Sequence, residues 1–214
     1  MSERWSQLRS RARLQLRLLR HHLVSHTVTI DGHDLHIPPG VLDPILFRSG
    51  AWFGRQLARR VAGGERLLDM GCGSGVVGVL CQQAGARVIC SDLNPNAVQA
   101  ARRNGILDAR SGDLFSSLPG HRFDHIAFNP PYFPGCSRRR MYGMALYGGR
   151  RLGVMQRFLD QLPHHLANGG RGWMVLSDRA PAGQKLVTVA GWRQVTVERV
   201  DDEVLSLWST SRTG

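Results

Sequence analysis

The chain has 214 residues, of which 42% are hydrophobic and 21% are charged. That length suits one domain with a short appendage, and the ordinary apolar content argues against intrinsic disorder. No stretch approaches the roughly 18 consecutive apolar residues that a membrane-spanning helix needs, so we expect a protein that does not span a membrane.

The charge is strongly positive, because 28 Lys+Arg stand against 16 Asp+Glu and give a formal net charge of +12. Lys185 is the only lysine, so the excess is arginine, whose guanidinium group pairs with phosphate or carboxylate through two hydrogen bonds. An anionic partner and a coding bias toward arginine explain this charge equally well. The cysteines form no Cys-x-x-Cys pair, and no histidine cluster has zinc-ligand spacing. We therefore expect no metal site, and reduced thiols in a cytoplasmic protein.

Residues 2–26 are predicted to form a basic amphipathic helix. Apolar residues recur there at steps of three and four, which places them on one face of a helix. A row of arginines lies beside that face: Arg9, Arg13, Arg17 and Arg20. The row could contact RNA or an acidic protein, or it could be a solvated face. A mitochondrial presequence, also rich in arginine and poor in acids, is a further alternative.

Residues 27–30 and 33–37 are predicted strands on either side of Asp31-Gly32, a dipeptide that favours a two-residue hairpin turn of type I′. The prolines and glycine of residues 38–40 end this hairpin. We therefore expect residues 1–40 to form an extension, made of the basic helix and the hairpin, and residues 41–214 to form the main domain. A helix within residues 47–61 opens that domain.

From residue 66 onward, short apolar strands alternate with helical stretches, which predicts an α/β fold with a parallel sheet covered on both faces. The last two strand-like runs are separated only by Asp201-Asp202, so we expect them to pair as an antiparallel hairpin. The predicted strands are residues 66–70, 87–91, 123–128, 172–176, 192–200 and 203–210, and the predicted helices are residues 75–84, 95–104 and 152–166.

A glycine-rich turn follows the first strand of this series and opens the next helix. Its candidate binding residues are Asp69, Gly71, Gly73 and Gly75. Glycine lets a ligand approach the backbone closely, and the helix N-terminus offers unpaired N–H groups. The turn also satisfies the dinucleotide pattern G-x-G-x-x-G, so by itself it does not identify the ligand.

Two acids follow the next strands. Asp92, beside Leu93, lies about 20 residues beyond the glycine turn, where an acid accepts hydrogen bonds from the ribose hydroxyls of NAD or of S-adenosylmethionine. The alternative is a helix cap before Pro95. Asp113 follows a further strand, where it could accept from an adenine amino group while Leu114 packs on the ring. The alternative is an Asx-turn.

The most informative motif is Asn129-Pro130-Pro131-Tyr132, directly after the predicted strand 123–128. Its prolines fix a rigid turn just beyond the carboxyl end of a strand, where open α/β sheets bind ligands. The Asn129 side-chain oxygen and the Pro130 carbonyl oxygen can both accept from one NH2 group, and Tyr132 offers a flat face for stacking. This suits a carboxamide or the exocyclic amine of a base, with the nitrogen lone pair held toward an electrophilic methyl group.

Together these motifs resemble the class I S-adenosylmethionine-dependent methyltransferases, specifically the branch that methylates amino groups. The chain is most similar to the HemK family, which methylates the glutamine amide of peptide-chain release factors. Residues 145–149, Ala-Leu-Tyr-Gly-Gly, add to that likeness. The resemblance implies a Rossmann-like sheet of seven strands, mostly parallel, with an antiparallel C-terminal hairpin.

The resemblance also implies S-adenosylmethionine as the cofactor. The glycine turn would line its methionine and ribose portion, Asp92 would bind the ribose hydroxyls, and Asp113 with Leu114 would bind the adenine. The implied cofactor residues are Asp69, Gly71, Gly73, Gly75, Asp92, Leu93, Asp113 and Leu114. The implied catalytic residues, which would orient the accepting nitrogen, are Asn129, Pro130 and Tyr132.

One departure concerns the acceptor. Where the family carries a Pro-Glu-Thr or Glu-Asp-Thr motif, residues 43–49 read Asp-Pro-Ile-Leu-Phe-Arg-Ser. The loop after the tetrapeptide contains Arg138, Arg139 and Arg140, which would attract a phosphate backbone. The departure and the arginines weaken the release-factor assignment. The resemblance still favours a release-factor glutamine as the acceptor, with an RNA or DNA base amine as the runner-up and a small molecule as the third choice.

Two other classes remain to be weighed. An NAD-dependent dehydrogenase would share the glycine turn and Asp92, but it leaves the tetrapeptide unexplained. A chain that binds cofactor and only stabilises another subunit is also compatible with the motifs, and the basic N-terminal helix leaves room for a partner subunit.

Overall fold

The computed structural model describes residues 23–133, 135, 145–149 and 151–211. Most of the predicted basic helix lies outside the described residues, and so do Arg138, Arg139 and Arg140.

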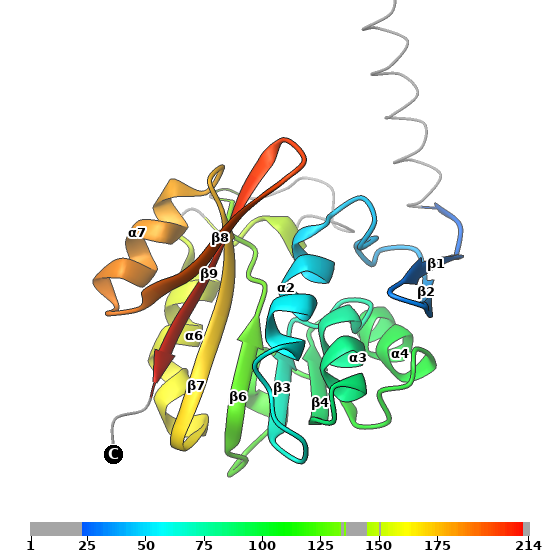
Figure 1. Cartoon of the computed structure of the whole chain (residues 1–214), viewed down its shortest axis with the longest axis horizontal. Coiled ribbons are helices and arrows are strands. Elements are labelled where there is room, and N and C mark those ends of the chain that lie inside the picture. Colours follow the sequence, from blue (N-terminus) through cyan, green and yellow to red (C-terminus); the bar gives the residue numbers. More distant parts are fainter. Residues whose placement is uncertain (1–22, 134, 136–144, 150, 212–214) are drawn as a thin grey trace, which may run out of the picture.

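Seven strands form one sheet in the order β5-β4-β3-β6-β7-β9-β8 (Figure 1). The pairs from β5 to β7 are parallel, whereas β9 is antiparallel to both β7 and β8. The seven-stranded α/β sheet with its antiparallel C-terminal hairpin is thereby confirmed. The strands are β3 (Arg66–Met70), β4 (Arg87–Asp92), β5 (Ala109–Ser111), β6 (Phe123–Phe128), β7 (Leu166–Ser177), β8 (Arg193–Val200) and β9 (Glu203–Ser211).

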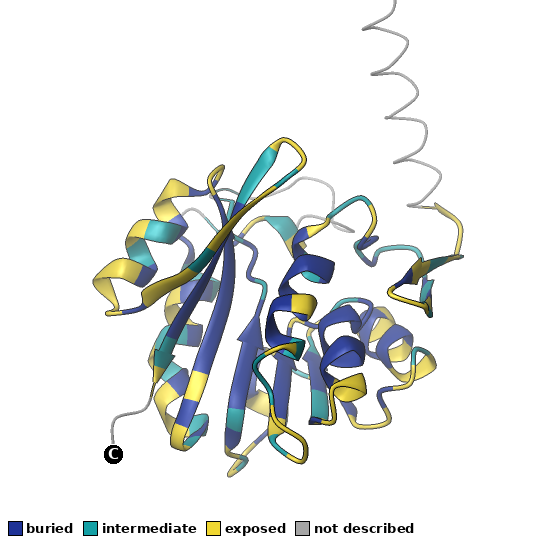
Figure 2. Cartoon of the chain, in the orientation of Figure 1, coloured by how far each residue is buried: buried dark blue, intermediate teal, exposed yellow. Residues whose placement is uncertain are grey.

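Helices cover both faces of the sheet. Neighbouring residues of one strand belong to different apolar clusters: Leu67 and Ala127 to one, Leu68 and Ile126 to the other. Successive side chains of a strand point to opposite faces, so the central strands are buried on both sides (Figure 2). The helices are α2 (Ser49–Ala58), α3 (Val76–Gln83) and α4 (Pro95–Arg103) with the first cluster, and η1 (Leu114–Ser117), α6 (Gly153–His165) and α7 (Pro181–Val189) with the second.

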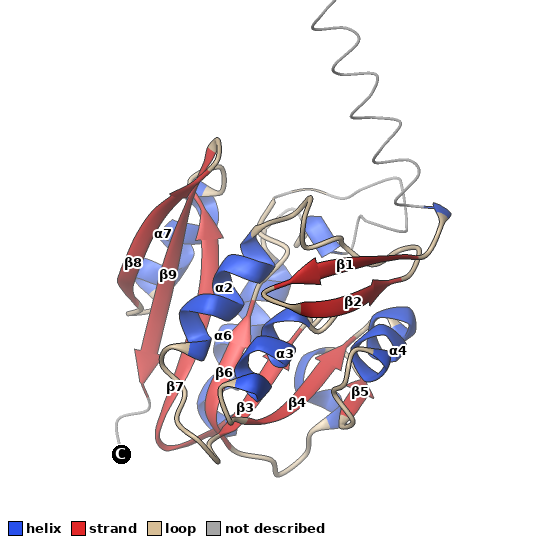
Figure 3. Ribbon diagram, turned by 45° about the vertical axis from the view of Figure 1, so that its right-hand side comes forward, coloured by secondary structure: helices blue, strands red, loops and turns tan. Residues whose placement is uncertain are grey.

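The predicted hairpin forms a separate two-stranded sheet from β1 (His26–Ile30) and β2 (His33–Ile37), beside α4 (Figure 3). Asp31 and Gly32 have φ angles of 49° and 83°, as the type I′ turn requires. The side chain of Asn104 accepts from the His36 N–H at 2.7 Å and donates to the His36 carbonyl at 3.0 Å. The hairpin therefore packs on the large sheet's helices and shares their apolar core.

Several elements differ from the sequence-based expectation, which gave no range for β5 and did not include η1. Strand β7 begins at Leu166 rather than at residue 172, because Gly169 and Gly170 fall within an irregularity of its pairing with β6 rather than ending the strand. Helix α7 was not predicted, and it begins with Pro181, which suits the first turn of a helix. Among the described residues, no helix is long and apolar enough to cross a membrane.

Candidate active site

The glycine-rich turn lies between the carboxyl end of β3 and the start of α3. Gly71, Gly73 and Gly75 all have positive φ angles, of 64°, 54° and 79°. A Cβ atom on Gly75 would also lie 3.1 Å from the Ala101 Cβ atom, whereas the space beside Gly73 is open. The turn therefore needs glycine for its backbone and leaves room beside Gly73 for a ligand.

Asp92 ends β4 beside this turn. Its carboxylate accepts hydrogen bonds from the N–H groups of Gly73 at 2.9 Å and Asn94 at 2.8 Å. Burial raises the pKa of Asp92, and these backbone donors oppose that effect. Leu93 presents a half-exposed apolar side chain next to it. A carboxylate at the rim of the glycine turn fits the hydroxyl groups of a ribose.

Asp69 lies below the turn rather than on its surface. Its side chain is 2% exposed and accepts from the Gly78 N–H at 3.0 Å, so it ties β3 to α3. Burial raises the pKa of Asp69 to about 7. Direct contact of Asp69 with a cofactor stays a prediction.

Asp113 and Leu114 follow β5 at the same edge of the sheet. The Asp113 carboxylate receives two hydrogen bonds from Arg157 of α6, at 2.7 and 3.0 Å, a partner that the sequence did not reveal. Leu114 has a positive φ of 50° and its side chain is buried in the cluster around α6. Binding of adenine by these two residues stays a prediction.

The tetrapeptide lies where β6 ends, next to the start of α2. The Asn129 side-chain nitrogen donates to the Ser49 hydroxyl at 3.2 Å, which leaves the amide oxygen available to another donor. Tyr132 is half-buried, and burial raises its pKa to about 12, so its hydroxyl stays protonated at neutral pH. Pro130 is buried, which fixes the position of the turn.

The stretch 145–149 returns to the tetrapeptide. Phe133 N–H donates to the Leu146 carbonyl at 3.1 Å, and Gly148 N–H donates to the Phe133 carbonyl at 3.0 Å. A Cβ atom on Gly148 would collide with the Pro131 carbonyl oxygen. Glycine is therefore required at position 148 for the chain to pass the tetrapeptide.

Ser49 is the partner of Asn129 that sequence reasoning missed. The one feature of the sequence that could have pointed to Ser49 is its place at the end of residues 43–49, where the chain departs from the HemK pattern. In that segment Asp43 is buried, and its carboxylate bonds His26 at 2.9 Å and the Ile45 N–H at 2.7 Å. These contacts fix the segment that carries Ser49 into α2.

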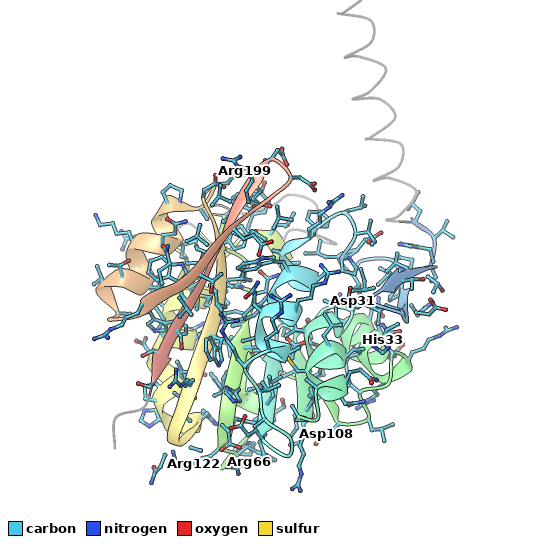
Figure 4. The ribbon with its side chains drawn as sticks, viewed as in Figure 1. Asp31, His33, Arg66, Asp108, Arg122 and Arg199 are labelled. Atoms are coloured by element: carbon cyan, nitrogen blue, oxygen red, sulfur yellow. The ribbon has the colours of Figure 1, made fainter. Side chains whose placement is uncertain are left out.

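A cavity of about 560 Å3 lies at the opposite, amino-terminal edge of the sheet. Arg66, Asp108 and Arg122 are among its lining residues and lie together at that edge in Figure 4. It is separate from the motif residues, all of which lie at or just beyond the carboxyl ends of strands. No group of side chains suited to a metal ion occurs among the residues that the structure describes.

Comparison with known proteins agrees with this geometry. The family model called methyltransferase small domain matches residues 55–204. A release factor glutamine methyltransferase of Xylella fastidiosa is 30% identical over 59% of this chain and 52% of its own length. Ribosomal RNA small subunit methyltransferase C of Alcanivorax borkumensis is 32% identical over 62% of this chain and 38% of its own. The chain thus spans about half the length, or less, of such relatives.

A solved structure shows the same fold. It is that of the E. cuniculi Mtq2-Trm112 complex, which is responsible for methylation of the eRF1 translation termination factor. Its identity with this chain is 22%, and its TM-score is 0.63 over 81% of this chain and 99% of that one. The glycine turn, Asp92 and the fold all fit S-adenosylmethionine, which is bound in the solved structure of the T. thermophilus 16S rRNA methyltransferase RsmC. The chain belongs to the methyltransferase small domain family of S-adenosylmethionine-dependent methyltransferases.

Proposed function

We propose that the chain methylates a planar amide nitrogen, with the glutamine side chain of a release factor as its acceptor. The observation that carries this proposal is the Asn129 side chain, whose nitrogen is bonded to Ser49 at 3.2 Å. Its oxygen is therefore the atom left for the acceptor. With the Pro130 carbonyl it offers two acceptors to the two hydrogens of one NH2 group.

These two oxygens compensate for the weak nucleophilicity of an amide nitrogen. The nitrogen lone pair of a carboxamide is delocalised toward its carbonyl group and is a weak nucleophile. S-adenosylmethionine, when bound, supplies an electrophilic methyl group. As the nitrogen takes up positive charge, its hydrogen bonds to Asn129 and Pro130 strengthen, so the site stabilises the transition state more than the ground state. Tyr132 holds the planar group by stacking, and the released proton passes to solvent.

The cofactor in this proposal lies along the carboxyl edge of the sheet. Gly71, Gly73 and Gly75 face its methionine and ribose portion, supported from below by Asp69. Asp92 binds the ribose hydroxyls with Leu93 beside it, and Asp113 with Leu114 binds the adenine. The space beside Gly73 and the carboxylate of Asp92, both at the end of β3 and β4, support this placement.

A second candidate acceptor is the exocyclic amine of an RNA base. It has the same planar NH2 group, and a ribosomal RNA methyltransferase is as similar to this chain as the release-factor enzyme is. The net charge of +12 would favour a phosphate backbone. Binding of RNA would then weaken steeply with salt, whereas binding of a release factor would depend on salt less.

The test is methyl labelling of a cell extract with isotopically labelled S-adenosylmethionine, followed by protease or nuclease. We expect protease-sensitive label that maps to a glutamine of a release factor. Nuclease-sensitive label would overturn the protein acceptor in favour of the base amine. The extract also supplies any partner subunit, which matters because the Mtq2 structure was solved with Trm112.

Asn129→Ala tests the site itself. We expect labelling to fall at least about a hundredfold, the typical cost of removing one transition-state hydrogen bond, with the affinity for S-adenosylhomocysteine unchanged. Asn96→Ala, which removes an exposed asparagine of α4, is the matched control and should keep full activity. Full activity of Asn129→Ala would show that the tetrapeptide does not orient the acceptor.

A further inference from the structure

Ser49 joins the two polar side chains of the tetrapeptide. It is the first residue of α2, its side chain is buried, and its hydroxyl oxygen lies 3.2 Å from the Asn129 amide nitrogen. An asparagine amide has almost the same shape when it rotates by 180°, but the rotation exchanges a donor for an acceptor. The neighbour of that amide therefore decides which atom faces the substrate.

The Ser49 hydroxyl oxygen accepts from the Asn129 amide nitrogen. Ser49 also interacts with the Tyr132 hydroxyl group and lowers the pKa of that phenol, against the larger effect of burial. Because the amide nitrogen is the atom that faces Ser49, the amide oxygen faces away from it.

Contacts along α2 hold Ser49 in place. The Trp52 indole N–H donates to the Glu198 carboxylate at 2.6 Å, and Arg48 forms an ion pair with Asp201 at 2.5 Å. A Cβ atom on Gly54 would lie only 2.7 Å from a Leu80 methyl group, so α2 packs closely on α3. The hydroxyl is thus fixed by the hairpin β8–β9 and by α3.

We infer that Ser49 is a positioning and specificity-determining residue, which fixes Asn129 so that its oxygen accepts from the substrate nitrogen. This inference rests on the proposed function and deepens it. A site locked in this orientation selects a nitrogen that donates two hydrogen bonds. It disfavours a carbonyl oxygen or an unprotonated ring nitrogen, which would face an oxygen lone pair instead of a donor.

The test compares three variants of Ser49 in the full chain. The acceptor is whichever of release factor and ribosomal RNA takes the label in the experiment above. Ser49→Ala removes the hydroxyl group, and Ser49→Cys fills the same space with a weak hydrogen-bonding group, so both should lower kcat about tenfold. Ser49→Thr keeps the hydroxyl group and should stay within about threefold of wild type. The affinity for S-adenosylhomocysteine should not change in any of them.

Ser206→Ala is the matched control. Ser206 is also buried and also makes two hydrogen bonds, to the Leu176 carbonyl at 3.1 Å and from the Trp208 indole at 2.8 Å, but it belongs to β9. It should lower the melting temperature at least as much as Ser49→Ala while keeping kcat. If a loss of stability alone explained the effect of Ser49→Ala, then Ser206→Ala would lower kcat as much.

The inference is overturned if Ser49→Ala and Ser49→Cys keep kcat within about twofold of wild type, or if they lose cofactor affinity in parallel with kcat. Failure of the proposed function looks different, because Asn129→Ala would then remain active whatever Ser49 does. Loss of activity in Asn129→Ala together with full activity in both Ser49 variants would reject only the role of Ser49.

Discussion

Replacing Asp69 with asparagine tests how much the burial of this carboxyl group beneath the glycine turn destabilises the fold when the group is ionised. Burial is the largest cause that raises the pKa of Asp69 from its ordinary 3.8 to about 7. The nearby charge of Asp92 also raises it, whereas the hydrogen bond from Gly78 lowers it. Asparagine keeps an oxygen that can accept from the Gly78 N–H but carries no charge. The variant therefore isolates the cost of burying the carboxylate.

The sign of the effect follows from proton binding. Between pH 3.8 and about 7 the folded chain keeps a proton on Asp69 that the unfolded chain has lost. The contribution of Asp69 to the free energy of unfolding therefore falls as the pH rises through this window and is constant above it. Over the whole window, the free energy of unfolding changes by about 4 kcal/mol because of Asp69. The part between pH 5 and pH 7 corresponds to roughly 2–3 kcal/mol.

The assay is urea unfolding of wild type and Asp69→Asn without cofactor, at steps from pH 5 to pH 8. Titrating groups that do not interact with Asp69 contribute equally to both proteins, so we expect the variant's advantage in free energy of unfolding to grow by roughly 2–3 kcal/mol up to pH 7 and then to stay level. Asp124→Asn is the control. Burial acts to raise the pKa of Asp124, but hydrogen bonds from Arg66 hold that pKa below 3.8. The effect of Asp124→Asn on the free energy of unfolding should therefore not vary between pH 5 and pH 8. An advantage of Asp69→Asn that is independent of pH would refute the reasoning.

Three further changes should have separable effects. Gly148→Ala should push the Pro131 carbonyl away and lower kcat at least about tenfold, with the affinity for S-adenosylhomocysteine in calorimetry within about threefold of wild type. Asp92→Ala should weaken that affinity about ten- to hundredfold, because a charged acceptor of ribose hydrogen bonds is lost. Unchanged binding would place the ribose elsewhere. Glu198→Ala should lower the melting temperature by about 2–6 °C, because the Trp52 indole N–H, now bonded at 2.6 Å, loses its acceptor. An unaltered melting temperature would show that water replaces this bond without cost.

The sequence by itself determined those parts of the protein that depend on local patterns. The Asp31-Gly32 turn, the strand–helix alternation from residue 66 onward and the C-terminal hairpin were all predicted, because period-2 and period-3.6 patterns and turn residues act over a few positions. Strand β7 shows the limit. From local sequence alone, Gly169 and Gly170 predict that a strand does not extend through them. They belong to a strand only because that segment pairs with β6.

Tertiary structure decided how the tetrapeptide is oriented. Ser49 is 80 residues from Asn129, and Trp52 is 146 residues from Glu198. No spacing rule links residues so far apart, because their contact depends on how α2 crosses the sheet. The sequence therefore identified the residues able to bind a planar nitrogen. The fold decided which end of the Asn129 amide faces it, since the amide nitrogen donates to Ser49 and the amide oxygen is left for the substrate.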